Sequence, residues 1–155
     1  MKRSITSKAV TVVAALVLAL APDQASSQQA DSNQLVVVLH ARNPTRRMTA
    51  EQLKNLMLGN VAFWHGVVPV KVFVRPPNSP AAQVLFDKVI EMPASRFNEH
   101  WTAKQLAGQG IAPTVLATPE QVAAEVAKVP GAVGVILQSE AWNAQLTGVN
   151  LIPLN

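Results

Sequence analysis

The chain has 155 residues, no cysteine and a formal net charge of +4, with thirteen Lys and Arg against nine Asp and Glu. Without cysteine it can form no disulfide framework, no thiolate metal site and no cysteine-linked lipid anchor. From Asp31 onward ten basic residues face eight acidic ones, so the net charge falls to +2 and nucleic-acid binding is not indicated.

Residues 1–25 have the pattern of a secretory signal peptide. Three basic residues among the first eight precede an apolar run over 9–21. This run is shorter than the roughly 20 residues that a membrane-spanning helix needs, and Pro22 ends it, so we expect no permanent membrane anchor. Cleavage is expected between 21 and 30, with Ala21, Ala25 and Ala30 as open alternatives. The mature protein is therefore expected to be periplasmic or secreted.

The mature part is expected to form one domain. Residues 26–33 are polar and rich in Gln, without apolar periodicity, which indicates a flexible lead-in. The remaining segment, 34–155, is long enough for one hydrophobic core and too short for two comfortable ones.

The first half of this domain alternates strand and helix signals. The β-branched run 35–39 predicts a strand buried on both faces. A loop over 41–48 carries Arg42, Arg46 and Arg47 and is interpreted as a solvated basic loop, the alternative being that it steers anions or an acidic partner surface. Thr49 and Gln52 form a capping-box pattern for a helix over 50–58 that Gly59 ends.

A second strand and two further helices are expected in the middle of the chain. Residues 68–74 predict a strand, and Asn78 or Ser79 can cap a helix that begins at Pro80. A third helix is expected over 96–106. Its buried side is predicted to consist of Phe97, Trp101 and Leu106.

The last third repeats the alternation. Thr118 and Gln121 predict the start of a fourth helix, which Pro130 and Gly131 end. A strand over 133–137, a helical turn over 140–145 and a strand over 149–153 follow. Strands alternating with helices predict an α/β domain, a three-layer sandwich with a mixed, largely parallel sheet.

Three segments resemble the phosphate-binding proteins of bacterial ABC uptake systems. They are 48–64 with its Thr-x-x-Gln-Leu helix start and Gly-Asn-x-x-x-Trp turn, Val72–Arg75 followed by Asn78 and Ser79, and the Pro-Gly-Ala-Val-Gly turn at 130–134. The resemblance covers 35–137 and implies a fold like one lobe of a type 2 periplasmic binding protein. In the turn at 130–134, glycine occurs where a side chain would obstruct close backbone approach.

The same resemblance implies an oxyanion site at Arg75, Asn78, Ser79 and Ala81. Full-size relatives hold phosphate with a strand-end arginine, an acid and a Ser-Gly-Thr helix start, and here Pro77, Pro80 and Ala81 stand where the acid, glycine and threonine would be. A helix start and an adjacent arginine both favour an anion. The alternative is that Ser79 is only an N-cap and Arg75 a solvated strand end.

Other chemistry-bearing residues suggest no catalytic role. His40, His65 and His100 lack the spacing of a metal site. The sequence has neither a Gly-x-Ser-x-Gly elbow nor a Walker loop, so we expect no enzyme, metal or cofactor. Each of the three tryptophans, Trp64, Trp101 and Trp142, is expected to be a core anchor, the alternative being a stacking platform for a sugar or a base.

Two functional hypotheses follow. The first is a periplasmic protein resembling the phosphate-binding components of ABC transporters, which binds phosphate or another oxyanion weakly near Arg75 and Ser79. The second is an interaction module on the same fold that has no ligand and binds a periplasmic or membrane protein partner.

Overall fold

The computed structural model describes residues 32–144 and 146–155, so the predicted signal peptide, its cleavage positions and residues 26–31 of the lead-in lie outside the described part. The strands are β1 (Leu35–His40), β2 (Phe63–Trp64), β3 (Val68–Pro69), β4 (Lys71–Val74), β5 (Thr114–Val115), β6 (Ala132–Leu137) and β7 (Val149–Pro153). The helices are α2 (Ala50–Met57), α3 (Pro80–Val84), the π-helix η1 (Leu85–Ile90), α4 (Ala94–Leu106), α5 (Pro119–Lys128) and α6 (Gln138–Asn143).

Five strands form the central sheet in the order β5-β4-β6-β1-β7. β4 is parallel to β5 and β6, whereas β1 is antiparallel to both of its neighbours, β6 and β7. Four strands therefore run in one direction and β1 in the other. The predicted α/β fold with a mixed, largely parallel sheet is confirmed.

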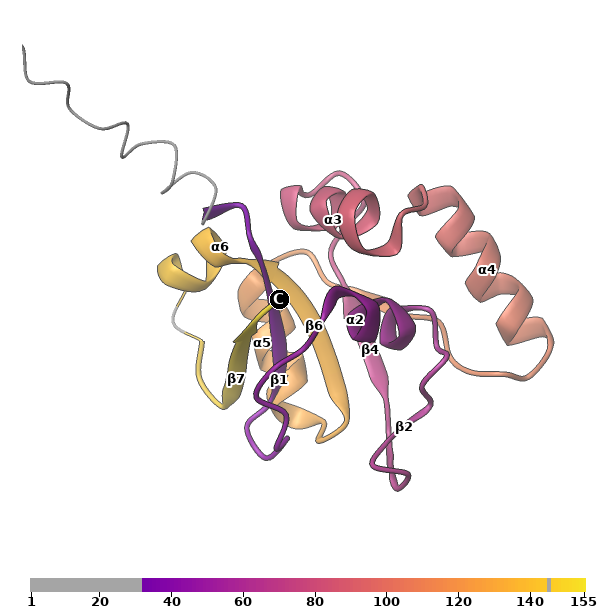
Figure 1. The fold of residues 1–155 in the computed structure, drawn as a ribbon, viewed down its shortest axis with the longest axis horizontal. Coiled ribbons are helices and arrows are strands. Elements are labelled where there is room, and N and C mark those ends of the chain that lie inside the picture. The colour runs from indigo at the N-terminus through magenta and orange to yellow at the C-terminus, as the bar shows by residue number, and fades with distance from the viewer. Residues whose placement is uncertain (1–31, 145) are drawn as a thin grey trace, which may run out of the picture.

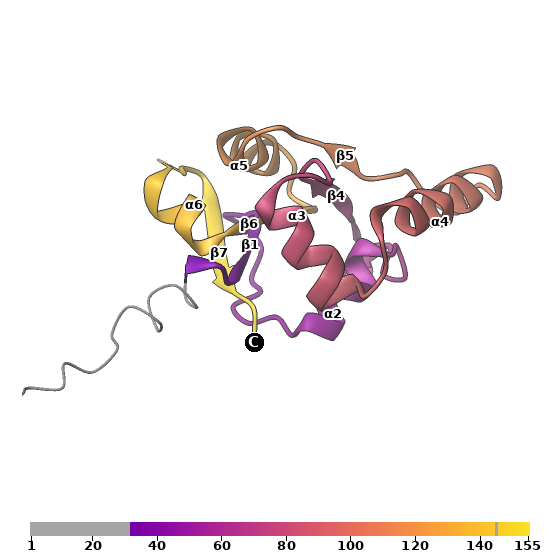
Figure 2. The same ribbon diagram turned by 90° about the horizontal axis from the view of Figure 1, so that it is seen from above.

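Helices cover both faces of this sheet, as the two ribbon views show (Figure 1, Figure 2). α2, α3, η1 and α4 bury their apolar side chains against one face, and α5 packs on the other. β1 contributes Leu35, Val37 and Leu39 to the first core and Val36 and Val38 to the second. Because successive strand residues point to opposite faces, this run is buried on both sides, as predicted.

The turn into β6 and the strand itself require glycine for close approach, as predicted. A Cβ on Gly131 would overlap the carbonyl oxygen of Pro69, and one on Gly134 would overlap the side chain of Val122 on α5. Gly131 thus lets the β2–β3 hairpin lie against the start of β6, and Gly134 lets α5 lie close to the sheet.

The predicted strand over 68–74 is wrong as a single element. Val68 and Pro69 pair with Trp64 and Phe63 in a separate hairpin, and only Lys71–Val74 joins the central sheet. The hairpin turns through His65 and Gly66, both of which have positive φ. Proline at 69 lacks an N–H for a continuous ladder, which explains the break.

The burial of Leu106 and Trp142 was predicted wrongly. Leu106 is 86% exposed and Trp142 is 64% exposed, whereas Phe97 and Trp101 are buried. Leu106 is the last residue of α4, whose end extends away from the sheet (Figure 1), and it follows Phe97 by nine residues, which places it on the opposite side of the helix. Trp101 is fixed in the core because its indole N–H donates to the carbonyl oxygen of Met57 at 3.1 Å.

Within residues 32–144 and 146–155, no helix has both the length and the apolar character needed to cross a membrane.

Candidate functional site

The carboxyl ends of β4, β5 and β6 meet at one edge of the sheet because these strands are mutually parallel. Each strand is followed by a segment that starts a helix: α3 after β4, α5 after β5 and α6 directly after β6. In open α/β sheets, this edge is where ligands bind. Arg75, the first residue after β4, lies there.

Arg75 is a buried cation with one acidic partner. Its Nη1 donates to Oε1 of Glu140 on α6 at 2.9 Å, and the side chains of Arg75 and Glu140 are 8% and 20% exposed. The second carboxylate oxygen of Glu140 accepts the N–H of Leu137 at 2.9 Å. Glu140 is therefore held by the end of β6 and holds Arg75 in turn. The alternative interpretation of Arg75 as a solvated strand end is wrong.

One donor of Arg75 is left without a partner. Its Nε is buried and makes no hydrogen bond among the described residues. A buried guanidinium N–H without an acceptor carries a desolvation cost, which an incoming acceptor would relieve.

The start of α3 offers one further donor. Ser79 is the N-cap, as predicted: its Oγ accepts from the N–H of Ala82 at 3.3 Å, and its carbonyl oxygen accepts from Gln83 at 3.0 Å. Pro80 has no N–H. Within the described residues no acceptor is bonded to the N–H of Ala81, so it is a backbone donor that a ligand at this helix start could use.

The other two predicted site residues differ in exposure. Asn78 is exposed on the loop before the N-cap, whereas the side chain of Ala81 is buried in the core on the α2 side. Ala81 can therefore offer only its backbone to a ligand.

The start of α5 lies within electrostatic reach of Arg75. The pKa of Glu120 is lowered from its ordinary value of 4.5 mainly by a hydrogen bond from its own backbone, next by the hydroxyl of Thr118, and to a smaller degree by the charge of Arg75. Glu120 is thus a second carboxylate near the edge.

Sequence reasoning missed Glu140. It treated the acid of this site as lost because Pro77 occupies the expected position, but Glu140 supplies a carboxylate to Arg75 from 65 residues further along the chain. The available signal was a glutamate three residues after a buried strand, where it can bond back to the strand end.

No group of three or more His, Asp or Glu side chains within the described residues is arranged to hold a metal ion.

The fold matches one lobe of the fold of phosphate-binding proteins of ABC transporters. The chain superposes on PstS from Borrelia burgdorferi with a TM-score of 0.59 and 15% identity, covering 79% of this chain and 47% of that one. An ABC-type phosphate transport receptor from Vibrio cholerae matches with a TM-score of 0.54 and 18% identity, covering 77% and 45%. No protein-family model and no curated protein sequence matches the chain.

The chain spans about half the length of these two structures. The resemblance suggested by the three sequence segments is thereby confirmed at the level of the fold. Identity this low establishes the fold alone, so function has to be argued from the site.

Proposed function

We propose that the protein is an exported oxyanion-binding domain, built like one lobe of a phosphate-binding protein, that binds phosphate at the carboxyl edge of its sheet. The observation that carries the proposal is the buried guanidinium of Arg75, whose Nε lacks a hydrogen-bond partner among the described residues, at the edge of the sheet where α3 begins with Ala81 as its first N–H after Pro80. Both groups donate hydrogen bonds, and a phosphate oxygen accepts them.

Glu140 gives this site a preference among oxyanions. Its carboxylate accepts hydrogen bonds, so it favours an anion that still carries a proton and disfavours one that does not. Hydrogen phosphate carries a proton near neutral pH and sulfate does not. We therefore expect phosphate to bind better than sulfate.

The site is half of a ligand shell. The two solved structures to which the chain is similar are each about twice as long as the part that matches, so this chain contributes one wall where those proteins have more. We expect weak binding for this reason, since fewer contacts surround the anion.

A thermal-shift series with the mature protein tests the proposal, with phosphate and sulfate compared against chloride at constant ionic strength. A ligand that binds only the folded state adds about 2.7 kcal/mol at 100 times its dissociation constant. We expect a shift with phosphate that Arg75→Lys abolishes, because lysine lacks the guanidinium fork. Arg42→Gln, at an exposed position on the basic loop, is the control and should retain the shift. Equal shifts with phosphate and sulfate would contradict the role of Glu140.

A second candidate function is a protein-interaction module, and one observation favours it. Leu106, Ile111 and Val115, along the connection from α4 to the edge strand β5, are all large apolar residues with more than half of their surface exposed. Exposed apolar groups of this kind mark interaction surfaces. In this case Leu106→Ser with Ile111→Ser should abolish capture of a periplasmic or membrane partner, and Arg75→Lys should not. If phosphate released the bound partner, the partner interaction would depend on the anion, and a role as an interaction module without a ligand would be contradicted.

A further inference from the structure

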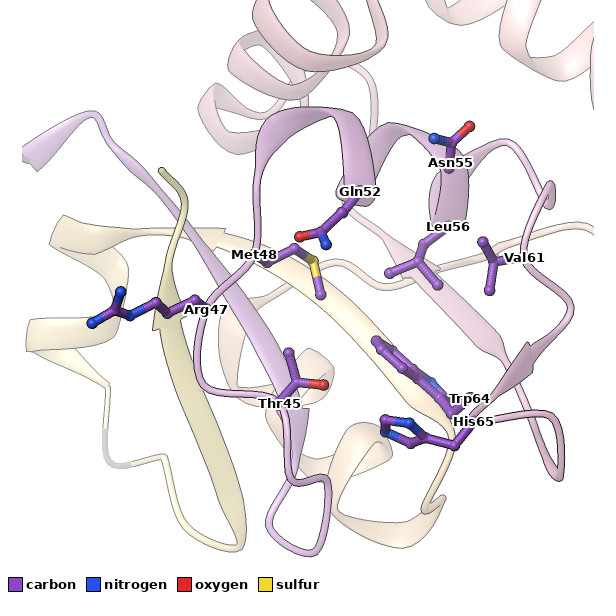
Figure 3. A pocket seen from close by; sticks show the side chains of 9 residues that line it. All are labelled: Thr45, Arg47, Met48, Gln52, Asn55, Leu56, Val61, Trp64 and His65. Carbon is purple, nitrogen blue, oxygen red and sulfur yellow. The ribbon is translucent and has the colours of Figure 1, made fainter.

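A pocket of 310 Å³ lies at the opposite end of β4 from Arg75. It is lined by the loop before α2, by α2 itself and by the β2–β3 hairpin (Figure 3). Its volume is within the range of small-molecule sites. The side chains that carry the argument are Thr45, Met48, Gln52, Leu56, Trp64 and His65.

Trp64 forms a fixed aromatic wall. Its indole N–H donates to the carbonyl oxygen of Gly131 at 3.0 Å, which ties the ring to the turn before β6. Figure 3 shows the ring extending from the hairpin toward Met48 and Leu56. Since its polar N–H is already satisfied, the ring offers only its π-surface and its apolar edge to a ligand.

His65 closes one side of the pocket. Its φ of 48° is in the left-handed region, which a residue with a side chain seldom adopts. Its imidazole lies beside Trp64 and faces Thr45 across the space between them (Figure 3). The two rings and the sulfur of Met48 line the same part of the pocket, the slot, and offer a planar apolar group aromatic and polarisable surface.

The polar groups around this slot favour an acceptor. Oε1 of Gln52 accepts the N–H of Thr49 at 2.9 Å in the capping box of α2, which leaves the NH₂ group of Gln52 as a donor. The guanidinium of Arg46 donates to the carbonyl oxygen of Thr45 at 3.2 Å and brings positive charge next to the lining. Arg47 adds a second cation at the rim, turned outward in Figure 3.

No acidic side chain lines this pocket, and every lining residue is in the described part of the chain. We propose that the pocket binds an aromatic carboxylate, with its ring in the slot at Trp64 and its carboxylate toward Gln52 and the basic loop. This site is separate from the edge at Arg75 and does not depend on the function proposed there.

The experiment uses naphthoate as the probe and heteronuclear NMR of the mature protein as the readout. We expect saturable shifts of the indole N–H of Trp64 and of amides around Leu56 at millimolar probe. Cyclohexanecarboxylate has the charge without the aromatic ring, and naphthylmethylammonium has the ring with the opposite charge. Both should bind at least about tenfold more weakly than naphthoate.

Gln52→Glu is the decisive variant. A glutamate at this position keeps the capping-box oxygen that accepts from Thr49, but replaces the NH₂ donor with a negative charge. We expect naphthoate affinity to fall about tenfold or more, because like charges then face each other.

Gln121→Glu is the matched control. Gln121 is at the same position of α5, where the N-cap Thr118 accepts its N–H at 3.2 Å and its Oε1 accepts from Ala117 at 2.9 Å. The change alters net charge equally on a different helix and should leave naphthoate binding unchanged. Absence of a saturable shift, equal binding of the cationic probe, or equal affinity of the Gln52→Glu and Gln121→Glu variants would overturn the proposal. Arg75→Lys should not affect naphthoate binding, which separates this result from that of the phosphate site.

Discussion

Arg75 at the end of β4 and Glu140 on α6 are 65 residues apart in sequence, and their side chains form an ion pair at 2.9 Å. The pair joins two elements that are not adjacent in the chain but are brought together because β4 and β6 are neighbours in the sheet. Both members are largely withdrawn from water, so each depends on the other for compensation of its charge.

Glu140→Gln should destabilise the fold by about 2 kcal/mol. The glutamine can still accept the N–H of Leu137, but it leaves the buried guanidinium of Arg75 without a counter-charge, and the residual exposure of Glu140 keeps the cost below that of a fully buried pair. Urea unfolding measures the effect.

The control for this change is Glu125→Gln, which removes an exposed pair with Lys128 on α5. Surface pairs of this kind contribute little, and the change should stay within about 0.5 kcal/mol. If the two variants were equally stable, the Arg75–Glu140 pair would contribute no more than a surface contact.

Glu91 should make stability depend on pH. It ends η1 in the left-handed conformation, with φ of 57°, and pairs with Lys54 of α2 at 2.6 Å. The hydrogen bond from Lys54, and then its charge, lower the pKa of Glu91 below its ordinary value of 4.5. A lowered folded-state pKa gives stability that is present above the unfolded-state pKa and is lost as pH falls through the folded-state value.

The measurement is the unfolding midpoint of the wild type against Glu91→Gln over a pH series. The wild type should be the more stable at neutral pH, and the difference should vanish below the folded-state pKa of Glu91. High salt should shrink the difference at neutral pH, because the pair is exposed to solvent. A difference independent of pH would show that the carboxylate charge is not its source.

Local signals account for the parts of the fold that the sequence predicted. The burial of β1 on both faces follows from its unbroken apolar run. The starts of α2 and α5 follow from Thr49 and Thr118, each of which caps its helix through its hydroxyl. The need for glycine at 131 and 134 was predicted correctly, because a side chain at either position would overlap the neighbouring segment.

Tertiary placement accounts for what the sequence did not predict. The pairing of Arg75 with Glu140 depends on strand order, which no local pattern encodes. β5 is only two residues long and too short to give a periodic signal. Leu106 follows Phe97 by nine residues, so at about 3.6 residues per turn it lies on the opposite side of α4 from the buried Phe97. The predicted role of Asn78 remains a prediction.

Gly134→Ala should destabilise the fold through a direct clash with α5. The added Cβ would overlap Cγ1 of Val122, a fully buried side chain. Overpacking in a core costs about 1–3 kcal/mol. A double-mutant cycle with Val122→Ala should show favourable coupling, because the smaller side chain makes room for the new methyl group. Strict additivity of the two changes would mean that the clash is relieved elsewhere.

Gly59→Ala should be more damaging than Gly108→Ala, although the two glycines have nearly the same backbone conformation. Their φ values are 67° and 68°, so the left-handed strain of about 1–2 kcal/mol is common to both. A Cβ on Gly59 would lie 2.5 Å from Cη2 of Trp101, whereas one on Gly108 would meet nothing within 4 Å. Trp101 cannot move freely, because its indole N–H is bonded to Met57 and its ring packs edge-to-face against Phe97.

Thermal unfolding of the two variants isolates this clash from backbone strain. We expect the Gly59→Ala midpoint to be lower than that of Gly108→Ala by several degrees, as about 1 kcal/mol of extra cost moves the midpoint of a domain this size by about 3–5 °C. Near-ultraviolet circular dichroism should change only in Gly59→Ala, because only that variant displaces a buried tryptophan. Equal midpoints and unchanged spectra would show that the ring of Trp101 does not contact Gly59. The contact between α4 and the end of α2 would then be wrong as well.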